Sequence, residues 1–87
     1  MKGYVYILRS LKNNRFYIGS SVDVKKRFKK HQDGLVFSTK RNRPHKIELT
    51  QEYPTITQAK QIEYRIKNLK RKDYIEKIIK DGYIKMS

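Results

Sequence analysis

The stretch GYVYILRSLKNNRFYIGSS, residues Gly3 to Ser21, contains two short runs of strand-forming residues separated by a polar segment. The first run, Tyr4 to Leu8, alternates aromatic and aliphatic side chains, and this period of two predicts a β-strand. The segment from Ser10 to Asn14 is polar and turn-like, and Arg15 to Ile18 predicts a second strand. The two runs therefore predict a β-hairpin, which Gly19 to Ser21 is expected to end.

The alternation separates two kinds of side chain. Val5 and Ile7 would point to one face of the hairpin and Tyr6 to the other, since successive side chains of a strand alternate. In the second run Ile18 and Tyr17 alternate in the same way. If the aliphatic face packs into the core, both tyrosines lie on the opposite face. The register stays open, because a slip of one residue reverses the faces.

The middle of the chain predicts a helix, a loop and a strand. The helix runs from Val22 to about Asp33 and ends before Gly34, with Val24 and Phe28 as its core stripe. Its N-cap is one of three polar residues: Ser20, Ser21 or Asp23. A basic loop follows from Leu35 to Pro44. The third strand is expected from Lys46 to Tyr53, with Ile47 and Leu49 on one face.

Two further helices are predicted in the last part of the chain. The first begins near Thr57 and ends at about Lys70, with apolar residues at helical spacing: Ala59, Ile62, Ile66 and Leu69. The second covers Tyr74 to Asp81, with a capping box formed by Asp73 and Glu76, and Gly82 stops it. A tail from residue 83 to 87 follows, and its Ile84 is a candidate to pack back onto the core. The order β-β-α-β-α-α predicts an α+β fold, a small three-stranded antiparallel sheet flanked by helices.

The length and composition of the chain limit the classes of function that we expect. The 87 residues suit one domain, taken as residues 1–87, and 22 Lys and Arg against 8 Asp and Glu leave a net charge of +14. Nucleic acid is the first partner expected for such a surface, and an anionic membrane surface is the second. No apolar run approaches the roughly 20 residues of a spanning helix, and there is no apolar signal-peptide core at the start. With no cysteine to form a disulfide or thiolate site, a cytoplasmic protein is expected.

Several residues have side chains suited to phosphodiester chemistry and occupy positions from which they could act together. Arg27 and His31 are four apart, so a helix places them on one face, although a solvated basic helix face is the simpler explanation of the pair taken alone. Glu63 lies beside the core stripe of its helix and could hold Mg²⁺, or it could only pair with Lys67. Gly19 could admit a phosphate close to the backbone or merely end a strand.

The residues together carry a resemblance to a known family. Tyr4-Val5-Tyr6 and Tyr17-Ile18-Gly19, followed by DVKKRFKKH, STKRNRP and EYPTITQAKQIEYRIKNLKRK, resemble the GIY-YIG endonuclease superfamily in its short, single-domain form. The resemblance covers about residues 3 to 80. It departs in three places: Tyr4 replaces the first glycine, Ser20 stands where repair nucleases of this type carry a lysine, and no residue is assigned to the asparagine that some members carry well after the glutamate, since Asn68 is only five residues past Glu63. A missing cationic helper could be supplied by Lys67.

The resemblance implies divalent-metal-dependent hydrolysis of DNA phosphodiester bonds. It implies that Tyr17 is the general base or water-positioning residue and that Tyr6 is its partner. Arg27 would stabilise charge on the phosphoryl group, and His31 would assist proton transfer or bind a phosphate. Glu63 would be the ligand to Mg²⁺ or Mn²⁺.

A basic rim is expected to follow the DNA backbone without reading its sequence: Lys26, Lys30, Lys40, Arg41, Arg43, Lys67, Lys70 and Arg71, with Gly19 at the strand end. One small domain predicts structure-guided or weakly sequence-selective cleavage. Two alternatives stay open: a basic nucleic-acid-binding module that has lost catalysis, and a structural protein of a ribonucleoprotein that binds RNA. The pathway, DNA repair among others, and the oligomeric state are also open.

Overall fold

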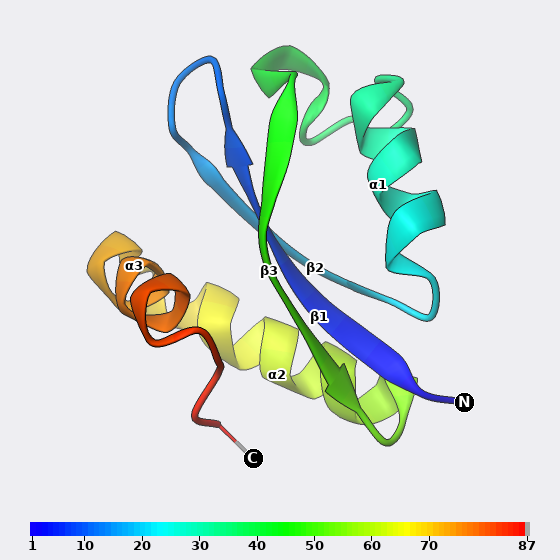
Figure 1. The fold of residues 1–87 in the computed structure, drawn as a ribbon, viewed down its shortest axis with the longest axis vertical. Coiled ribbons are helices and arrows are strands. Elements are labelled where there is room, and N and C mark those ends of the chain that lie inside the picture. Colours follow the sequence, from blue (N-terminus) through cyan, green and yellow to red (C-terminus); the bar gives the residue numbers. More distant parts are fainter. Residues whose placement is uncertain (87) are drawn as a thin grey trace.

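The structure is a computed structural model that describes residues 1–86. Over that range the chain forms one antiparallel sheet of three strands with three α-helices, in the order predicted from the sequence (Figure 1). The α+β fold is therefore confirmed. The elements are β1 (Gly3–Ser10), β2 (Phe16–Ser21), α1 (Val24–Gln32), the 3-10 helix η1 (Lys40–Asn42), β3 (His45–Tyr53), α2 (Ile56–Leu69) and α3 (Lys72–Asp81).

The sheet has the strand order β2-β1-β3, so β1 is central and β2 is an edge strand. Helix α1 lies on one side of the sheet, and α2 and α3 lie on the other (Figure 1). The core between the sheet and α2 is aliphatic: Val5, Ile7 and Ile18 pack with residues of α2 that include Ile62 and Ile66. Burial of this apolar surface is the main force that holds the helix on the sheet.

The register places the two tyrosines as predicted. Tyr6 pairs with Gly19 and Leu8 pairs with Tyr17, so all four residues lie on the face opposite Val5 and Ile7. The expectation that the second strand ends before Gly19 is wrong. Pairing with β1 continues through Ser20 and Ser21, because the backbone of an edge strand gains ladder hydrogen bonds whatever its side chains.

A β-bulge changes the faces of β3. The register shifts between Ile7 and Leu8, which pair with Leu49 and Ile47 respectively. Leu49 joins the core, whereas Ile47 lines a surface pocket on the α1 side with Val24. The prediction that Ile47 and Leu49 share one face is therefore wrong, since the extra residue of a bulge reverses the alternation.

The first residue of each helix differs from the prediction by one or two positions, whereas α3 ends at Asp81 as predicted. Helix α1 begins after Asp23, whose side chain accepts a hydrogen bond from Lys26 N at 3.1 Å. Helix α2 begins after Thr55, which caps it in the same way. The capping box predicted for α3 is wrong: Arg71 is the N-cap residue, and Asp73 lies inside the first turn.

Two predictions concern apolar residues near the C-terminus. Leu69 was expected in the core stripe of its helix, but it is 42% exposed at the end of α2, so this prediction is wrong. Ile84 packs back as predicted and is only 3% exposed. Ser87, the last residue of the expected tail, lies outside the described residues.

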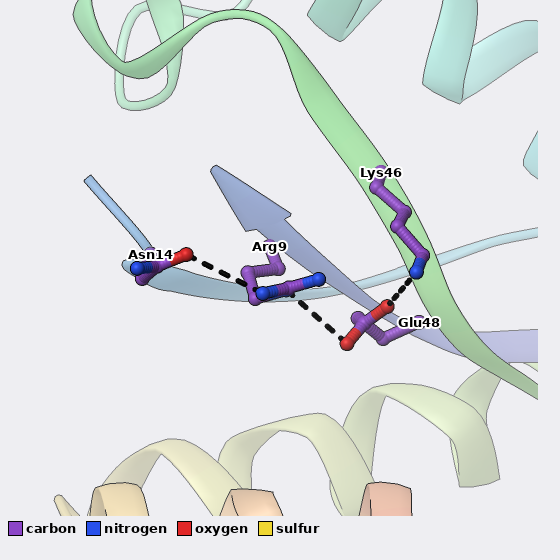
Figure 2. A network of polar contacts seen from close by, with 4 residues as sticks. All are labelled: Arg9, Asn14, Lys46 and Glu48. Atoms are coloured by element: carbon purple, nitrogen blue, oxygen red, sulfur yellow. Dashed lines mark hydrogen bonds and ion pairs between the residues drawn. The ribbon is translucent and has the colours of Figure 1, made fainter. Parts of the chain in front are cut away.

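A polar network ties the end of the β1–β2 hairpin to β3 (Figure 2). Arg9 Nε lies 3.3 Å from a Glu48 carboxylate oxygen, and Lys46 Nζ lies 3.2 Å from the other. Arg9 also donates to the Asn14 side chain at 3.4 Å. The network joins two strands and a turn at the end of the sheet.

Candidate active site

A pocket of about 520 Å³ opens along the edge strand β2 and gathers side chains from four elements. We call it the tyrosine pocket. Its lining residues are Tyr6, Tyr17, Gly19, Ser20, Arg27, Lys60, Glu63, Tyr64 and Lys67. Because β2 is at the sheet edge, residues of α1 on one face and α2 on the other reach the same opening.

Tyr6 is anchored behind the pocket by a buried histidine. Tyr6 Oη lies 3.0 Å from His31 Nε2, and His31 Nδ1 lies 2.7 Å from Thr39 Oγ1. His31 is fully buried, at 0% exposed. It therefore does not line the pocket. Its hydrogen bond on the pocket side is with Tyr6, which separates it from a ligand in the pocket.

The aromatic rings form a close cluster. The Tyr17 and His31 ring centroids are 4.9 Å apart, and the Tyr6 and Tyr17 centroids are 6.4 Å apart. Burial raises the pKa of Tyr6 to about 12, although the nearby Arg27 guanidinium acts in the opposite direction. Tyr6 is therefore a neutral phenol at pH 7. Burial lowers the pKa of His31 to about 4, and the positive charge of Arg27 adds to this effect, so His31 is neutral too.

Arg27 lines the pocket beside the two phenols. The neighbouring Tyr6 hydroxyl is the largest cause of an Arg27 pKa above the ordinary arginine value, and Tyr17 contributes in the same direction. The guanidinium is therefore always charged, and it lies beside both hydroxyl groups. This is a suitable donor for an anionic group that enters the pocket.

Glu63 supplies the carboxylate of the pocket, and both of its oxygens have donors. Ser20 Oγ donates to Oε1 at 2.5 Å, and Lys67 Nζ lies 2.6 Å from Oε2. The Lys67 ammonium also lies 5.3 Å from the centre of the Tyr17 ring. The predicted pairing of Glu63 with Lys67 is thus present, and it lies inside the tyrosine pocket.

Gly19 makes room for a side chain of the protein itself. A Cβ at this position would collide with the ring and hydroxyl group of Tyr6, its cross-strand partner. The glycine therefore allows Tyr6 to lie over the backbone of β2. Its sequence-based role as a point of phosphate approach stays a prediction.

The basic rim divides into three groups. Lys67, Lys70 and Arg71 line a second pocket, which shares Tyr17 and Lys67 with the tyrosine pocket. Lys40, Arg41 and Arg43 line a third pocket in the loop between α1 and β3, where the Arg43 guanidinium donates to the Lys40 and Gln32 carbonyl oxygens. Lys26 and Lys30 are exposed on α1.

The donor set of the tyrosine pocket fits a hard divalent cation held jointly with a substrate. Residues 1–86 contain no group of three or more His, Cys, Asp or Glu side chains that could hold a metal by themselves. Mg²⁺ is commonly bound by one or two carboxylates and completes its shell with water and phosphate oxygens. Glu63, with the hydroxyl groups around it, fits this pattern.

Sequence reasoning missed two contacts of the site. Thr39 was only part of a basic loop, and nothing in its neighbours signals a bond to His31. Ser20 was expected at a strand end, yet the alternation from Ile18 would have placed it toward Glu63 had the strand been extended.

Comparison with known proteins identifies the family of the chain. Residues 2–78 match the family described as the GIY-YIG catalytic domain. The chain is 37% identical over 73 residues to UPF0213 protein BH0048 of Halalkalibacterium halodurans, an alignment that covers 83% of this chain and 77% of that protein. It also resembles the solution NMR structure of the UPF0213 protein BH0048 from Bacillus halodurans, with a TM-score of 0.58, 34% identity, and coverage of 94% of this chain and 87% of the other.

The family is generally one of nucleases, which act on nucleic acid. Residues 1–86 also contain no helix with the length and apolarity needed to cross a membrane. The family match spans most of the chain, and the tyrosine pocket is lined by Tyr6, Tyr17 and Gly19 of the sequence signature. The chain belongs to the GIY-YIG family.

Proposed function

We propose that this protein is a divalent-metal-dependent endonuclease that hydrolyses DNA phosphodiester bonds with structure-guided or weak sequence selectivity. The observation that carries the proposal is the convergence of Tyr6, Tyr17, Arg27 and Glu63 in one pocket. Hydrolysis of a phosphodiester needs a positioned water, stabilisation of charge on the phosphoryl oxygens and help for the leaving oxygen. These side chains supply the required groups.

Glu63 would hold Mg²⁺ or Mn²⁺, which when bound neutralises phosphate charge and polarises the phosphoryl group. Arg27, always charged, would donate to the phosphoryl oxygens. Tyr17 would orient the attacking water and, once its own hydroxyl proton has passed to solvent, would accept the proton of that water. Ser20 orients the Glu63 carboxylate through its 2.5 Å hydrogen bond.

The buried chain behind the pocket would orient Tyr6. If Thr39 Oγ1 donates to the Val36 carbonyl oxygen, 3.4 Å away, it accepts from His31 Nδ1–H. His31 Nε2 then accepts from the Tyr6 hydroxyl, which leaves the phenol oxygen free to accept from Arg27 or water. In this arrangement His31 acts through Tyr6, in place of the direct phosphate contact that the resemblance allowed.

The test is a cleavage panel over duplex, branched, flapped and single-stranded DNA, with Mg²⁺ or Mn²⁺ against a chelator. We expect Glu63→Gln to reduce cleavage at least 100-fold while DNA binding survives, because the carboxylate charge that attracts the metal is lost. Glu76→Gln, on the exposed surface of α3, is the matched control and should cleave normally. Absence of metal-dependent cleavage by the wild type on every substrate would contradict the proposal.

One observation favours the alternative of a binding module without catalysis. Both Glu63 oxygens already have donors, and one of these donors is the Lys67 ammonium. A pair that never opens would leave a basic nucleic-acid surface and no metal site. Wild-type DNA binding together with undetectable Mn²⁺ binding would support this alternative.

A further inference from the structure

The loop between α1 and β3 exposes two large apolar side chains. Phe37 is 95% exposed and Leu35 is 72% exposed. Single exposed apolar residues are common on protein surfaces. What distinguishes Phe37 is the way in which its loop is held and the charge that surrounds it.

The loop is anchored at several points rather than loosely attached. Thr39, two residues after Phe37, is 1% exposed and bonds to His31 at 2.7 Å. Its backbone N–H donates to the Val36 carbonyl oxygen at 3.2 Å. At the far side, Ser10 Oγ donates to the Asn42 carbonyl oxygen at 2.6 Å. Phe37 therefore projects from a held loop, so less backbone freedom is lost if its ring binds something.

The surroundings of the ring are cationic. Phe37 lines a pocket of about 620 Å³ together with Lys12, Gln32, Lys40, Arg41, Arg43 and Pro44. This lining contains no acidic residue. The Lys40 and Arg41 side chains have no ion-pair partner within residues 1–86. An aromatic ring among free cations is suited to a polyanion that also presents flat apolar faces.

Nucleic acid with unpaired bases has this chemistry. Phosphates would lie on Lys40 and Arg41, and a base that is not stacked in a duplex would stack on Phe37, since every base has a π-face. A fully paired duplex offers phosphates but keeps its bases stacked. An apolar protein partner would not require the cations, and the net charge of +14 disfavours a cationic one.

We propose that Phe37 is a stacking platform for an unpaired base, so that the protein prefers DNA with single-stranded segments, such as flaps, gaps and junctions. This inference rests on the nucleic-acid binding of the proposed function and adds the substrate class to it. It involves the loop pocket, which shares no lining residue with the tyrosine pocket.

The binding test compares dissociation constants of the full chain for single-stranded, flapped and fully paired oligonucleotides of equal length, in a chelator that suppresses cleavage. We expect Phe37→Ala to weaken binding to the first two about tenfold, equivalent to about 1.4 kcal/mol, and to leave duplex binding within twofold. Tyr83→Ala is the matched control: Tyr83 is an aromatic residue, 52% exposed, with Lys85 near its ring. It should change no affinity.

A second measurement reports stacking directly. The chain has no tryptophan and seven tyrosines, so Phe37→Trp creates a single tryptophan at the loop, which can be excited separately from the tyrosines, and Tyr83→Trp creates one elsewhere. Single-stranded DNA should quench the first and leave the second unchanged.

Equal affinities of the wild type and Phe37→Ala for single-stranded DNA, or equal losses on all three substrates, would overturn the inference and leave the proposed function intact. Lack of binding by the wild type to any oligonucleotide would overturn both. Failure of Glu63→Gln to reduce cleavage bears only on the proposed function.

Discussion

Thr39 is the residue on which the orientation of the buried histidine depends. Its hydroxyl lies 2.7 Å from His31 Nδ1, and His31 in turn bonds to Tyr6. The three residues come from the loop, α1 and β1. If the Thr39 hydroxyl donates to the Val36 carbonyl oxygen, it accepts from His31 Nδ1–H, and the Tyr6 hydroxyl then donates to His31 Nε2.

Replacing Thr39 by Val removes this hydroxyl at nearly constant volume. We expect Thr39→Val to lower kcat at least tenfold with a smaller effect on KM, because His31 can then adopt the other tautomer and Tyr6 loses its fixed orientation. Thr39→Ser keeps the hydroxyl and should recover most of the activity. Nitrogen chemical shifts of the His31 ring would report the tautomer, and an unchanged tautomer in Thr39→Val would contradict this explanation.

If Glu63 binds a divalent cation as proposed, Lys67 would compete with the cation for the same carboxylate oxygen. The ammonium lies 2.6 Å from Glu63 Oε2, so it must move when a metal binds there. We expect Lys67→Gln to lower the Mn²⁺ dissociation constant severalfold, measured by titration calorimetry without DNA. Lys60→Gln, a change to another lysine of the pocket, should not tighten Mn²⁺ binding to the same extent. Equal affinities of the two variants would show that the ion pair does not oppose the metal.

The buried histidine makes stability depend on pH. The pKa of His31 falls from 6.5 to about 4 in the folded protein, mainly through burial. Between these values the unfolded chain binds more protons, so stability is complete above about pH 6.5 and decreases as the pH falls toward 4. The loss is at most about 3 kcal/mol. Urea unfolding at pH 7.5 and 4.5 measures it, and a His31 ring that titrates near 6.5 in the folded protein would contradict the prediction.

At the scale of the element, α2 connects the core to the site. One face of the helix buries Ile62 and Ile66 against the sheet, and the neighbouring positions Glu63 and Lys67 reach the tyrosine pocket. The packing of the aliphatic residues therefore sets how far the carboxylate lies from Tyr6 and Tyr17. Leu69, one turn further on, is outside this contact.

Two substitutions in α2 test which residues hold it. Ile66→Ala should reduce the free energy of unfolding by about 2–5 kcal/mol, because Ile66 is 1% exposed and its loss leaves a cavity. Leu69→Ala should cost less than about 1 kcal/mol, since the side chain is 42% exposed. Urea denaturation measures the free energy of unfolding of both variants. Equal losses would show that Leu69 packs more closely than its exposure indicates.

At the scale of the whole molecule, the net charge of +14 governs how nucleic acid is approached. Each phosphate that a cation neutralises releases counterions, so affinity falls steeply with salt. If about four phosphates are contacted, DNA binding should weaken roughly 100-fold between 50 and 200 mM salt. Fluorescence anisotropy measures the slope. In the double variant Lys40→Gln, Arg41→Gln, the slope of log affinity against log salt concentration should be smaller in magnitude by about two. An unchanged slope would show that the DNA does not contact the loop.

The local pattern of apolar and polar residues was sufficient to predict much of this fold. Alternation in the first strand predicted that Tyr6 and Tyr17 lie opposite Val5 and Ile7, because side chains of a strand alternate wherever pairing is regular. The helical spacing of Ile62 and Ile66 predicted their burial. The resemblance to a family predicted that Arg27 and Glu63 lie in the same site as the tyrosines. These features depend on neighbours in sequence or on a shared ancestor.

The tertiary structure alone decided the contacts that tune the site. Ser20 meets Glu63 across 43 positions of sequence, and Thr39 meets His31 from a loop with no repeating pattern. The bulge in β3 separated Ile47 from Leu49 although their spacing is that of one strand face. Such contacts depend on how α1, α2 and the loop pack against the sheet. Packing distances between remote segments leave no periodic signal in the chain, so only the folded arrangement specifies them.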